Sequence, residues 1–494
     1  AGLWGLERRR AAAAAAAAGP APSRFAPAQR VPTALRYGLL ALLCVAVALG
    51  PAPLQLAGLG LLWLLFLLFP ATGLALLAAV APLFLTPLPL LGRAFSPVEL
   101  TAWLLATALA ARLLMDAATG RRSRRSTTPP AAWPPMGLKA LDWPVLALLA
   151  VALASLAAAD NLGVALRELR TVIVTGALGY GLVRLAPADA AGRFDPWPVV
   201  WGIGLGAAVV AGWGLVQAVG GVGLIGAEGV WRVRGPFGSP NNLALYLGHA
   251  LPIMLAVAAF GRDRRRRLAA GLLSLLILLG LVLTFSKGAL LLALPAAVLF
   301  MGFAIGGRWR WIALGALAVG ALALLPLFAT ERFAGLFDLQ GGTSFLRVQL
   351  WRGAWNMMQD HPWLGVGLDN FLYAYRTRYA LPAAWQELNL SHPHNVVLDF
   401  WTRLGFLGLL VGLWLFTAAF WQGWPAFKRA SGERRALLLG LLAALVATLA
   451  HGLIDNSLFL VDLMLLFMLS LGLIARLAEA GTDKTSDGAA PSES

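Results

Sequence analysis

Residues 391–408 read SHPHNVVLDFWTRLGFLG and place two histidines and an asparagine directly before a long apolar run. The two histidines are His392 and His394, and the chain of 494 residues contains only five. The apolar run is long enough for a transmembrane helix, because about 20 helical residues cross the hydrocarbon core of a bilayer. The stretch therefore predicts a polar site at one end of a membrane-spanning helix.

The composition of the whole chain supports a membrane protein. Hydrophobic residues make up 59% of the sequence, charged residues only 13%, and the mean hydropathy is +0.76. Soluble domains carry about 25% charged residues. Cys44 is the only cysteine, so the sequence predicts neither a disulfide framework nor a cysteine metal site.

Apolar stretches of membrane length predict an all-α integral membrane protein with about 14 transmembrane helices, within a range of 12–14. Pro51 and Pro53 separate the first two stretches. Asp160 and Asn161 separate the fifth from the sixth. The predicted spans are centred near residues 45, 62, 82, 106, 151, 175, 208, 250, 276, 296, 320, 408, 445 and 467.

The basic residues orient these spans. Most of the 39 lysines and arginines fall in loops on one side of the predicted bundle, in clusters such as residues 121–125 and 262–267. Cytoplasmic loops carry such an excess, so we expect both termini to be cytoplasmic. The net charge of +16 is then a feature of topology, and we expect no nucleic-acid partner.

This topology divides the chain into segments. A basic Ala/Pro/Arg-rich tail, residues 1–36, lacks the pattern of a signal peptide, and a polar, disordered cytoplasmic tail covers residues 479–494. Transmembrane helices 1–11 fall in residues 37–329, and helices 12–14 fall in residues 396–478. Between them lies a large periplasmic loop, residues 330–395.

The periplasmic loop is expected to contain short helices. Residues 344–360, SFLRVQLWRGAWNMMQD, have apolar residues at helical spacing and end just before Pro362. The tryptophans suit a helix at the membrane interface, which would direct Arg347 and Arg352 toward lipid headgroups. A simple interfacial anchor with solvated arginines explains the same pattern equally well.

Polar residues from five regions of the chain fall on the predicted periplasmic side. They are Arg232 and Arg234 in WRVRGPFGSPNN, Lys287 in TFSKG, Arg347 in the loop helix, His392, His394 and Asn395 in SHPHN, and Asp455 in HGLIDN. Arginine binds phosphate through paired hydrogen bonds, and histidine accepts a proton near neutral pH. The set suits transfer from a lipid diphosphate, with the cations stabilising the leaving group. We expect no cofactor and no metal site.

Several of these residues have simpler explanations. His394 can be an interfacial histidine bonded to the backbone, and His392 can shape the turn or bind substrate. His249 and His451 lie within predicted spans, where packing and function are equally plausible. Asn241 and Asn242 can cap a helix, with substrate binding as the second possibility. Asp399 and Arg403 are four residues apart, as in a helix-stabilising pair.

A transporter or channel is the alternative from another functional class. A transporter is expected to have inverted repeats and charged residues near the membrane midplane. Here the predicted spans are almost free of charge, and the polar groups gather at one face. The sequence therefore favours an enzyme over a small-anion transporter.

The sequence resembles the superfamily of O-antigen ligases and polymerases, which are bacterial polytopic membrane glycosyltransferases. The resemblance lies in RVRGPFGSPNNLALYL, TFSKGALL, RVQLWRGAWNMMQDHPWLGVGLDNF and SHPHNVVLDFWTRLGFLG, with HGLIDNSLF as a weaker match. These pieces cover roughly residues 231–462, and the first seven spans are similar in hydropathy only. Their order and spacing are specific for the superfamily but do not separate ligase from polymerase.

The resemblance implies a GT-C-like bundle in the bacterial inner membrane that takes a glycan from undecaprenyl diphosphate on the periplasmic side. The acceptor is then lipid A core for a ligase, or a lipid-linked glycan for an exopolysaccharide or O-antigen polymerase. It also implies that His394 is the general base and that Arg234 and Arg347 bind the donor. Many members carry Ser-Arg where this chain has Ser286-Lys287, a change that keeps the charge but removes bidentate phosphate binding.

Overall fold

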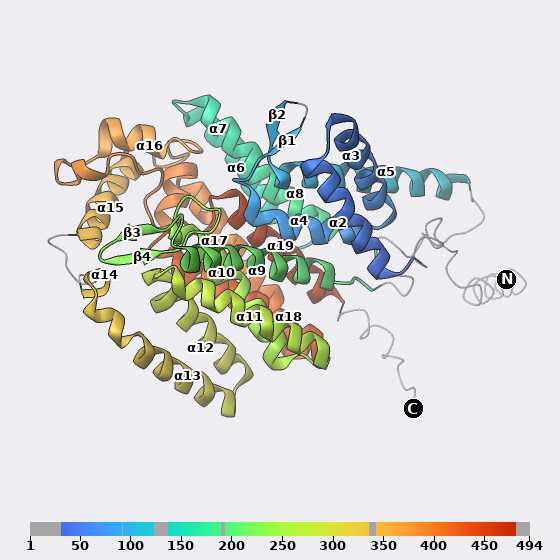
Figure 1. Ribbon diagram of the computed structural model, residues 1–494. Coiled ribbons are helices and arrows are strands. Elements are labelled where there is room, and N and C mark those ends of the chain that lie inside the picture. Colours follow the sequence, from blue (N-terminus) through green and yellow to red (C-terminus); the bar gives the residue numbers. More distant parts are fainter. Residues whose placement is uncertain (1–30, 91, 123–136, 189–192, 335–341, 481–494) are drawn as a thin grey trace, which may run out of the picture.

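The computed structural model describes residues 31–90, 92–122, 137–188, 193–334 and 342–480, and these form a bundle of helices (Figure 1). The expectations for residues 1–30, for most of the 121–125 basic cluster and for residues 481–494 lie outside this part of the chain.

Eight helices of the described chain are long and apolar enough to span a membrane. They are α5 (Pro97–Arg122), α9 (Trp197–Gly220), α10 (Pro240–Phe260), α11 (Arg264–Leu283), α13 (Arg308–Leu324, continued by a 3-10 turn to Ala329), α17 (Val396–Arg429), α18 (Gly432–Gly452) and α19 (Val461–Glu479). The last three coincide with the three spans that we expected in residues 396–478. Of the fourteen spans that we predicted, these eight are therefore supported.

The other predicted span centres fall on shorter helices or on helices with irregular turns. They are α2 (Thr33–Leu49), α3 (Ala52–Leu68), the 3-10 turn Ala81–Leu83 that continues α4 (Pro70–Val80), α6 (Asp142–Ser155), α8 (Thr175–Arg184), which follows α7 (Leu162–Glu168), and α12 (Leu294–Ile305). A π-helical turn, Leu169–Val174, joins α7 to α8, and another, Ala289–Ala293, precedes α12. The break between α2 and α3 lies at Pro51, as predicted.

The β-structure of the described residues consists of two short antiparallel hairpins. One pairs β1 (Leu88–Leu90) with β2 (Arg93–Phe95), and the other pairs β3 (Ile225–Ala227) with β4 (Val230–Arg232). The β3–β4 turn places Glu228 in the left-handed region at φ 50° and Gly229 at φ 76°. The hairpin lies beside α14 (Glu331–Ala334) and α15 (Gly342–Asp360) at one end of the bundle (Figure 1).

Helices α10, α18 and α19 form the centre of the bundle, and most of their residues are buried. They are apolar around their whole circumference, as expected for helices surrounded by other helices. Small residues allow close approach: a Cβ added to Gly440 of α18 would lie 2.8 Å from the Cα of Ile253 in α10. By contrast, α13 is largely exposed, as expected for a helix that faces lipid.

The segment between α13 and α17 has a small core of its own. It contains α15, α16 (Phe371–Ala374), a π-helical turn Tyr375–Tyr379 and a 3-10 turn Pro382–Glu387. The buried face of α15 packs there with the aromatic residues of α16 and the π-helical turn. The expectation of a structured segment with short helices is confirmed; its position relative to a membrane stays a prediction.

A kink in α17 attaches this segment to the bundle. Gly405 has a φ of 71°, and a Cβ at this position would lie 2.0 Å from the carbonyl oxygen of Trp363. The interrupted helix leaves the amide of Phe406 free to donate to Pro362 O at 2.7 Å. Val366 N likewise donates to Thr402 O at 2.8 Å. The segment is thus held by backbone bonds close to the SHPHN motif.

Candidate active site

The SHPHN motif connects the α15–α16 segment to α17, and three contacts fix its backbone. Arg403 donates to Ser391 O at 3.2 Å, and Trp351 Nε1 donates to Pro393 O at 2.9 Å. Asn395 caps α17, since its side-chain oxygen accepts from Val397 N and Leu398 N. The two histidines are therefore presented from a fixed backbone.

His394 itself adopts an unusual conformation, with a φ of 49°. Non-glycine residues rarely occupy this left-handed region, and such residues concentrate at functional sites. In the described chain three of the four non-glycine residues with positive φ, namely Glu228, Phe285 and His394, belong to the segments that meet here. This backbone strain agrees with a site in which side-chain direction matters.

His394 forms a dyad with Asp455. Its Nδ1 lies 2.7 Å from Asp455 Oδ1, and the histidine side chain is 22% exposed while the aspartate side chain is 4% exposed. A carboxylate at this distance favours the tautomer with the proton on Nδ1. In the neutral form of this tautomer, Nε2 carries no proton and can accept one, as a general base must.

Asp455 is held ionised by its neighbours. It accepts from Asn241 Nδ2 at 3.0 Å and from the backbone N of Asn456 at 2.9 Å, in addition to His394. Burial alone would raise the pKa of Asp455, but the two histidines outweigh burial and hold its pKa well below the ordinary value. The carboxylate therefore stays charged at neutral pH and orients His394.

His392 lies beside the dyad but is bonded differently. Its ring centroid is 4.3 Å from that of His394, and its Nε2 is 3.7 Å from Asp455 Oδ1, beyond a good hydrogen bond. Ser391 Oγ lies 3.0 Å from its Nδ1. Burial, followed by the neighbouring His394, lowers the pKa of His392. A neutral His392 places no additional positive charge beside His394.

The predicted cations fall into two groups. Arg232 is buried and donates to Thr284 O and Asn241 Oδ1, each at 2.6 Å. Lys287 is also buried and lies 3.4 Å from the carboxylate of Glu228. These two residues hold the hairpin and the Thr284–Gly288 turn together, so we assign Arg232 to positioning instead of phosphate binding.

Arg234 and Arg347 form the second group, since neither pairs with a carboxylate in the part of the chain that the structure describes. Arg234 is half-buried, and its Nε donates to Gly223 O at 3.3 Å. Arg347 is half-buried on α15, within electrostatic range of His451. Their guanidinium groups keep donors that an anionic substrate can engage.

Asn395, which we predicted to bind substrate, is occupied by the fold. Besides capping α17, its amide donates to Leu453 O at 2.9 Å, which joins the start of α17 to the end of α18. His249 is likewise engaged, with Nδ1 2.8 Å from Thr448 Oγ1 and Nε2 2.9 Å from Ser470 Oγ. We assign both residues to structure.

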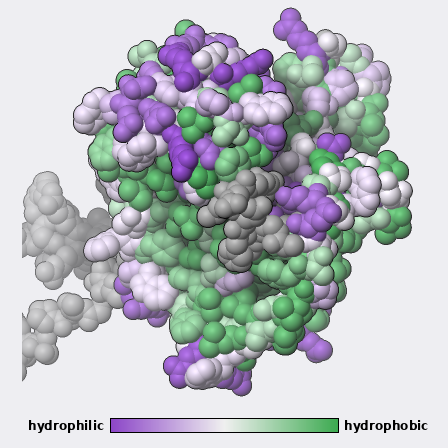
Figure 2. Space-filling view, turned by 90° about the vertical axis from the view of Figure 1, so that its left-hand side faces the viewer, coloured by the Kyte–Doolittle hydropathy of each residue, from purple (hydrophilic) through white to green (hydrophobic). Residues whose placement is uncertain are grey.

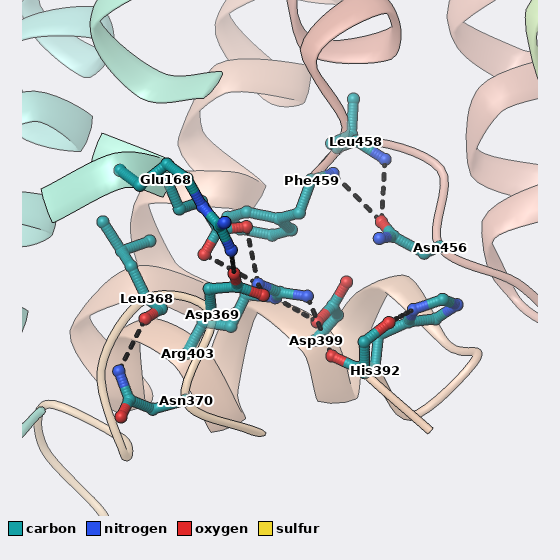
Figure 3. A network of polar contacts seen from close by, with 12 residues as sticks. Glu168, Leu368, Asp369, Asn370, His392, Asp399, Arg403, Asn456, Leu458 and Phe459 are labelled. Carbon is teal, nitrogen blue, oxygen red and sulfur yellow. Dashed lines mark hydrogen bonds and ion pairs between the residues drawn. The ribbon is translucent and has the colours of Figure 1, made fainter. Parts of the chain in front are cut away.

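The Asp399–Arg403 pair is real but buried, and it belongs to a larger network (Figure 3). Arg403 bonds Asp399 at 2.6 Å and also bonds both carboxylate oxygens of Glu168, at 2.6 and 2.7 Å. The same guanidinium reaches Ser391 O. This network therefore connects α7, α17 and the SHPHN motif behind the two histidines.

Sequence reasoning missed Asn241, Glu228 and Glu168 as partners of the site. Asn241 was considered only as a cap or a secondary ligand, although Ser239 provides the side-chain cap of α10. Glu228 had a usable signal, because it is an acid beside a glycine between two apolar strands. Glu168 had none, since its partner lies 235 residues further along the chain.

His392, His394 and Asp455 also form a set of three groups that can hold a metal ion, with ligand atoms within 4.8 Å of one another. Two imidazoles and a carboxylate match known zinc sites. However, zinc holds its ligand atoms at about 2.0–2.2 Å and would separate them by more than the 2.7 Å between His394 and Asp455. The observed distance is that of a direct hydrogen bond.

Fold and site together define a class: a mostly helical, polytopic membrane protein with a histidine–aspartate dyad and two available arginines at one end of the bundle. Residues 271–413 match the family model described as O-antigen ligase. This region contains Lys287, Arg347, His392, His394 and Asn395.

Two curated relatives give the same result. The chain is 31% identical to an O-antigen ligase of Pseudomonas aeruginosa over 192 residues. This aligned region covers 38% of this chain and 42% of the relative. The chain is 27% identical over 175 residues to an O-antigen ligase of Salmonella typhimurium, covering 34% and 43%. The matches thus span less than half the length of these relatives. They support membership of this chain in the O-antigen ligase superfamily, as the motifs predicted.

Proposed function

We propose that this protein transfers a glycan from an undecaprenyl diphosphate-linked donor to lipid A core at the periplasmic face of the bacterial inner membrane. The observation that carries the proposal is the His394–Asp455 dyad, in which Nε2 of the neutral imidazole can act as the base. Arg234, which follows β4, and Arg347, on α15, form no ion pair with a carboxylate among the residues that the structure describes. A GT-C-like arrangement of the helices and cytoplasmic termini are parts of the same proposal.

The dyad accounts for activation of the acceptor. His394 Nε2 accepts the proton of an acceptor hydroxyl as its oxygen attacks the anomeric carbon of the donor sugar. Asp455 stabilises the imidazolium that forms, because its carboxylate already accepts from Nδ1. Asn241 and the Asn456 amide keep that carboxylate in place during the step.

The arginines account for departure of the donor lipid. As the new glycosidic bond forms, the bond between the anomeric carbon and the diphosphate oxygen breaks, and the lipid diphosphate leaves with an additional negative charge. Arg234 and Arg347 stabilise that charge through charge-assisted hydrogen bonds. The balance needs no metal, since the proton goes to His394 and the charge goes to the arginines.

The ligase reaction is favoured over a polymerase because both curated relatives reported above are O-antigen ligases. A polymerase would use a lipid-linked glycan as acceptor and the same dyad. Figure 2, which looks onto the end of the bundle that carries α15 and α16, shows hydrophilic side chains over its upper part, as expected for a surface in contact with water.

The test is transfer by purified protein in proteoliposomes. A synthetic undecaprenyl diphosphate glycan is supplied with lipid A core, and the product is identified by mass spectrometry. We expect transfer to lipid A core, its loss in His394→Ala, and an unchanged rate with EDTA. Extension of the lipid-linked glycan alone would identify a polymerase, and no transfer to either acceptor would contradict the proposal.

A further inference from the structure

An open groove of about 440 Å³ lies on the outward face of α15, and no step proposed above uses it. It is lined by Val348, Trp351, Arg352, Trp355, Asn356 and Leu381. Its volume falls in the range of about 300–1,000 Å³ that is typical of small-molecule sites.

The spacing of these residues shows that the groove is a feature of one helix face. Residues 348, 351, 352, 355 and 356 recur at intervals of three and four, which places them on one side of α15. The opposite side, with Leu350, Ala354 and Met357, is buried in the small core. Leu381 supplies a second wall, and the groove is open to solvent along its length.

One end of the groove is joined to the dyad. Trp351 donates its indole N–H to Pro393 O at 2.9 Å, and Pro393 lies between His392 and His394. That hydrogen bond fixes the orientation of the Trp351 ring. One helical turn further on, Trp355 leaves 55% of its surface exposed. The groove therefore extends away from the reacting position along α15.

Its chemistry suits a carbohydrate. A pyranose ring presents C–H groups on its faces and hydroxyls around its edge. Indole rings pack against the C–H faces, and they offer a large rigid surface with a polar edge. The exposed Arg352 and Asn356 provide a guanidinium and an amide that can bond the hydroxyls. Predominantly aromatic walls with a few placed polar groups are what ligand sites require.

We propose that this groove is a glycan subsite, which binds a sugar one or more units away from the reacting bond. The proposal rests on the proposed function, because it places the groove beside the base of a glycosyl transfer. The sugar belongs either to the donor glycan or to the acceptor oligosaccharide, whose chemistry is the same. The second wall and the polar groups beside the tryptophans distinguish the groove from a row of aromatic membrane anchors.

The first experiment measures binding without transfer. Delipidated glycans prepared from the donor and from the acceptor are added separately to the full chain in nanodiscs, and contacts are read by saturation-transfer NMR. We expect one of the two glycans to give saturation-transfer signals with wild type and with His394→Ala. The same glycan should give no such signals with Trp355→Ala. Trp385→Ala, which removes an exposed tryptophan of the same segment outside the groove, is the matched control.

The second experiment uses transfer kinetics. Removing the stacking surface in Trp355→Ala is expected to raise KM about tenfold, which corresponds to about 1.4 kcal/mol, for the substrate that occupies the groove. The increase should shrink when that glycan is truncated to its reacting sugar. A higher KM for donor assigns the groove to the donor glycan, and a higher KM for acceptor assigns it to the acceptor.

Two results would overturn the subsite. One is equal glycan binding by Trp355→Ala and wild type. The other is quenching of a fluorophore on Trp355→Cys, made with Cys44→Ala, by nitroxide-labelled lipids, which would show that this face contacts the membrane. Neither depends on turnover, so a failure of the subsite is distinguishable from a failure of the proposed transfer.

Discussion

The imidazole of His394 and the carboxylate of Asp455 lie 2.7 Å apart, although 61 residues separate them in the chain. One residue precedes α17 and the other follows α18, two antiparallel neighbours whose adjacent ends meet here. The two helices thus bring the imidazole and the carboxylate together, and neighbouring residues allow the proposed roles of base and orienting group to be tested separately.

Replacing His394 by alanine should reduce the transfer rate about 100-fold or more, because general-base catalysis contributes about 10²–10⁴-fold. Lipid-linked donor should still bind, since the arginines are intact. His392→Ala is the matched variant two residues away, and it should reduce the transfer rate clearly less. Rates and donor binding in nanodiscs between pH 5.5 and 8.5 check both. Near-normal turnover by folded His394→Ala protein would exclude the base assignment.

Asp455→Asn should lower both turnover and stability. Because the folded-state pKa of Asp455 lies below its ordinary value of 3.8, the carboxylate stabilises the fold at pH values above 3.8. That contribution is lost as the pH falls through the depressed folded-state value. In detergent, wild type should therefore have a higher melting temperature than Asp455→Asn at pH 7. This difference in melting temperature should narrow only below about pH 4. A constant difference down to pH 3 would contradict this account.

Arg234→Ala and Arg347→Ala should each reduce kcat/KM about ten- to a hundredfold, since hydrogen bonds to charged groups contribute about 1.5–3 kcal/mol. Arg234→Lys should restore only part of this loss, because lysine cannot bind phosphate in a bidentate manner. Lys287→Arg should be tolerated, as it keeps the pair with Glu228. Full activity of Arg234→Lys would show that bidentate recognition is absent there.

Arg232→Gln should act differently from the Arg234 variants. Arg232 is connected to the dyad through Asn241, which in turn bonds Asp455. We therefore expect kcat to fall while KM for donor changes little, and Asn241→Ala should show the same division. A large rise in donor KM with kcat unchanged would instead assign Arg232 to phosphate binding.

The topology can be tested by labelling single cysteines with a membrane-impermeant reagent in a Cys44→Ala background. Trp385→Cys should be labelled in intact cells, and Arg125→Cys only after the membrane is opened. Labelling at 125 in intact cells, or its absence at 385, would reverse the orientation inferred from the basic residues.

The sequence predicted the helices and the meeting of distant segments because hydropathy and topology act over the whole chain. Loops that leave a bundle on one side must end at one face, which is why Arg232, Lys287, His394 and Asp455 were expected together. The start of α17 was also predictable, since Asn395 is a strong capping residue before an apolar run.

Other features depend on packing that no local pattern encodes. At the kink, the backbone of Trp363 lies so close to Gly405 that a Cβ would not fit. A glycine in an apolar run does not by itself predict such a contact. Glu228 has a positive φ, and its carboxylate lies 3.4 Å from Lys287, so the lysine that we predicted to bind substrate also forms an ion pair within the fold. Each outcome required knowledge of which segments touch.

The Glu168–Arg403–Asp399 network has a consequence for how the protein is made (Figure 3). Glu168 leaves the ribosome 235 residues before the arginine that neutralises it, and a buried carboxylate without a partner is strongly unfavourable. We therefore expect the nascent α7 to take its final place only after α17 has been synthesised and inserted. On this expectation, the order of assembly in the membrane differs from the order of synthesis, and the site is completed late, when the last three long helices join those that preceded them.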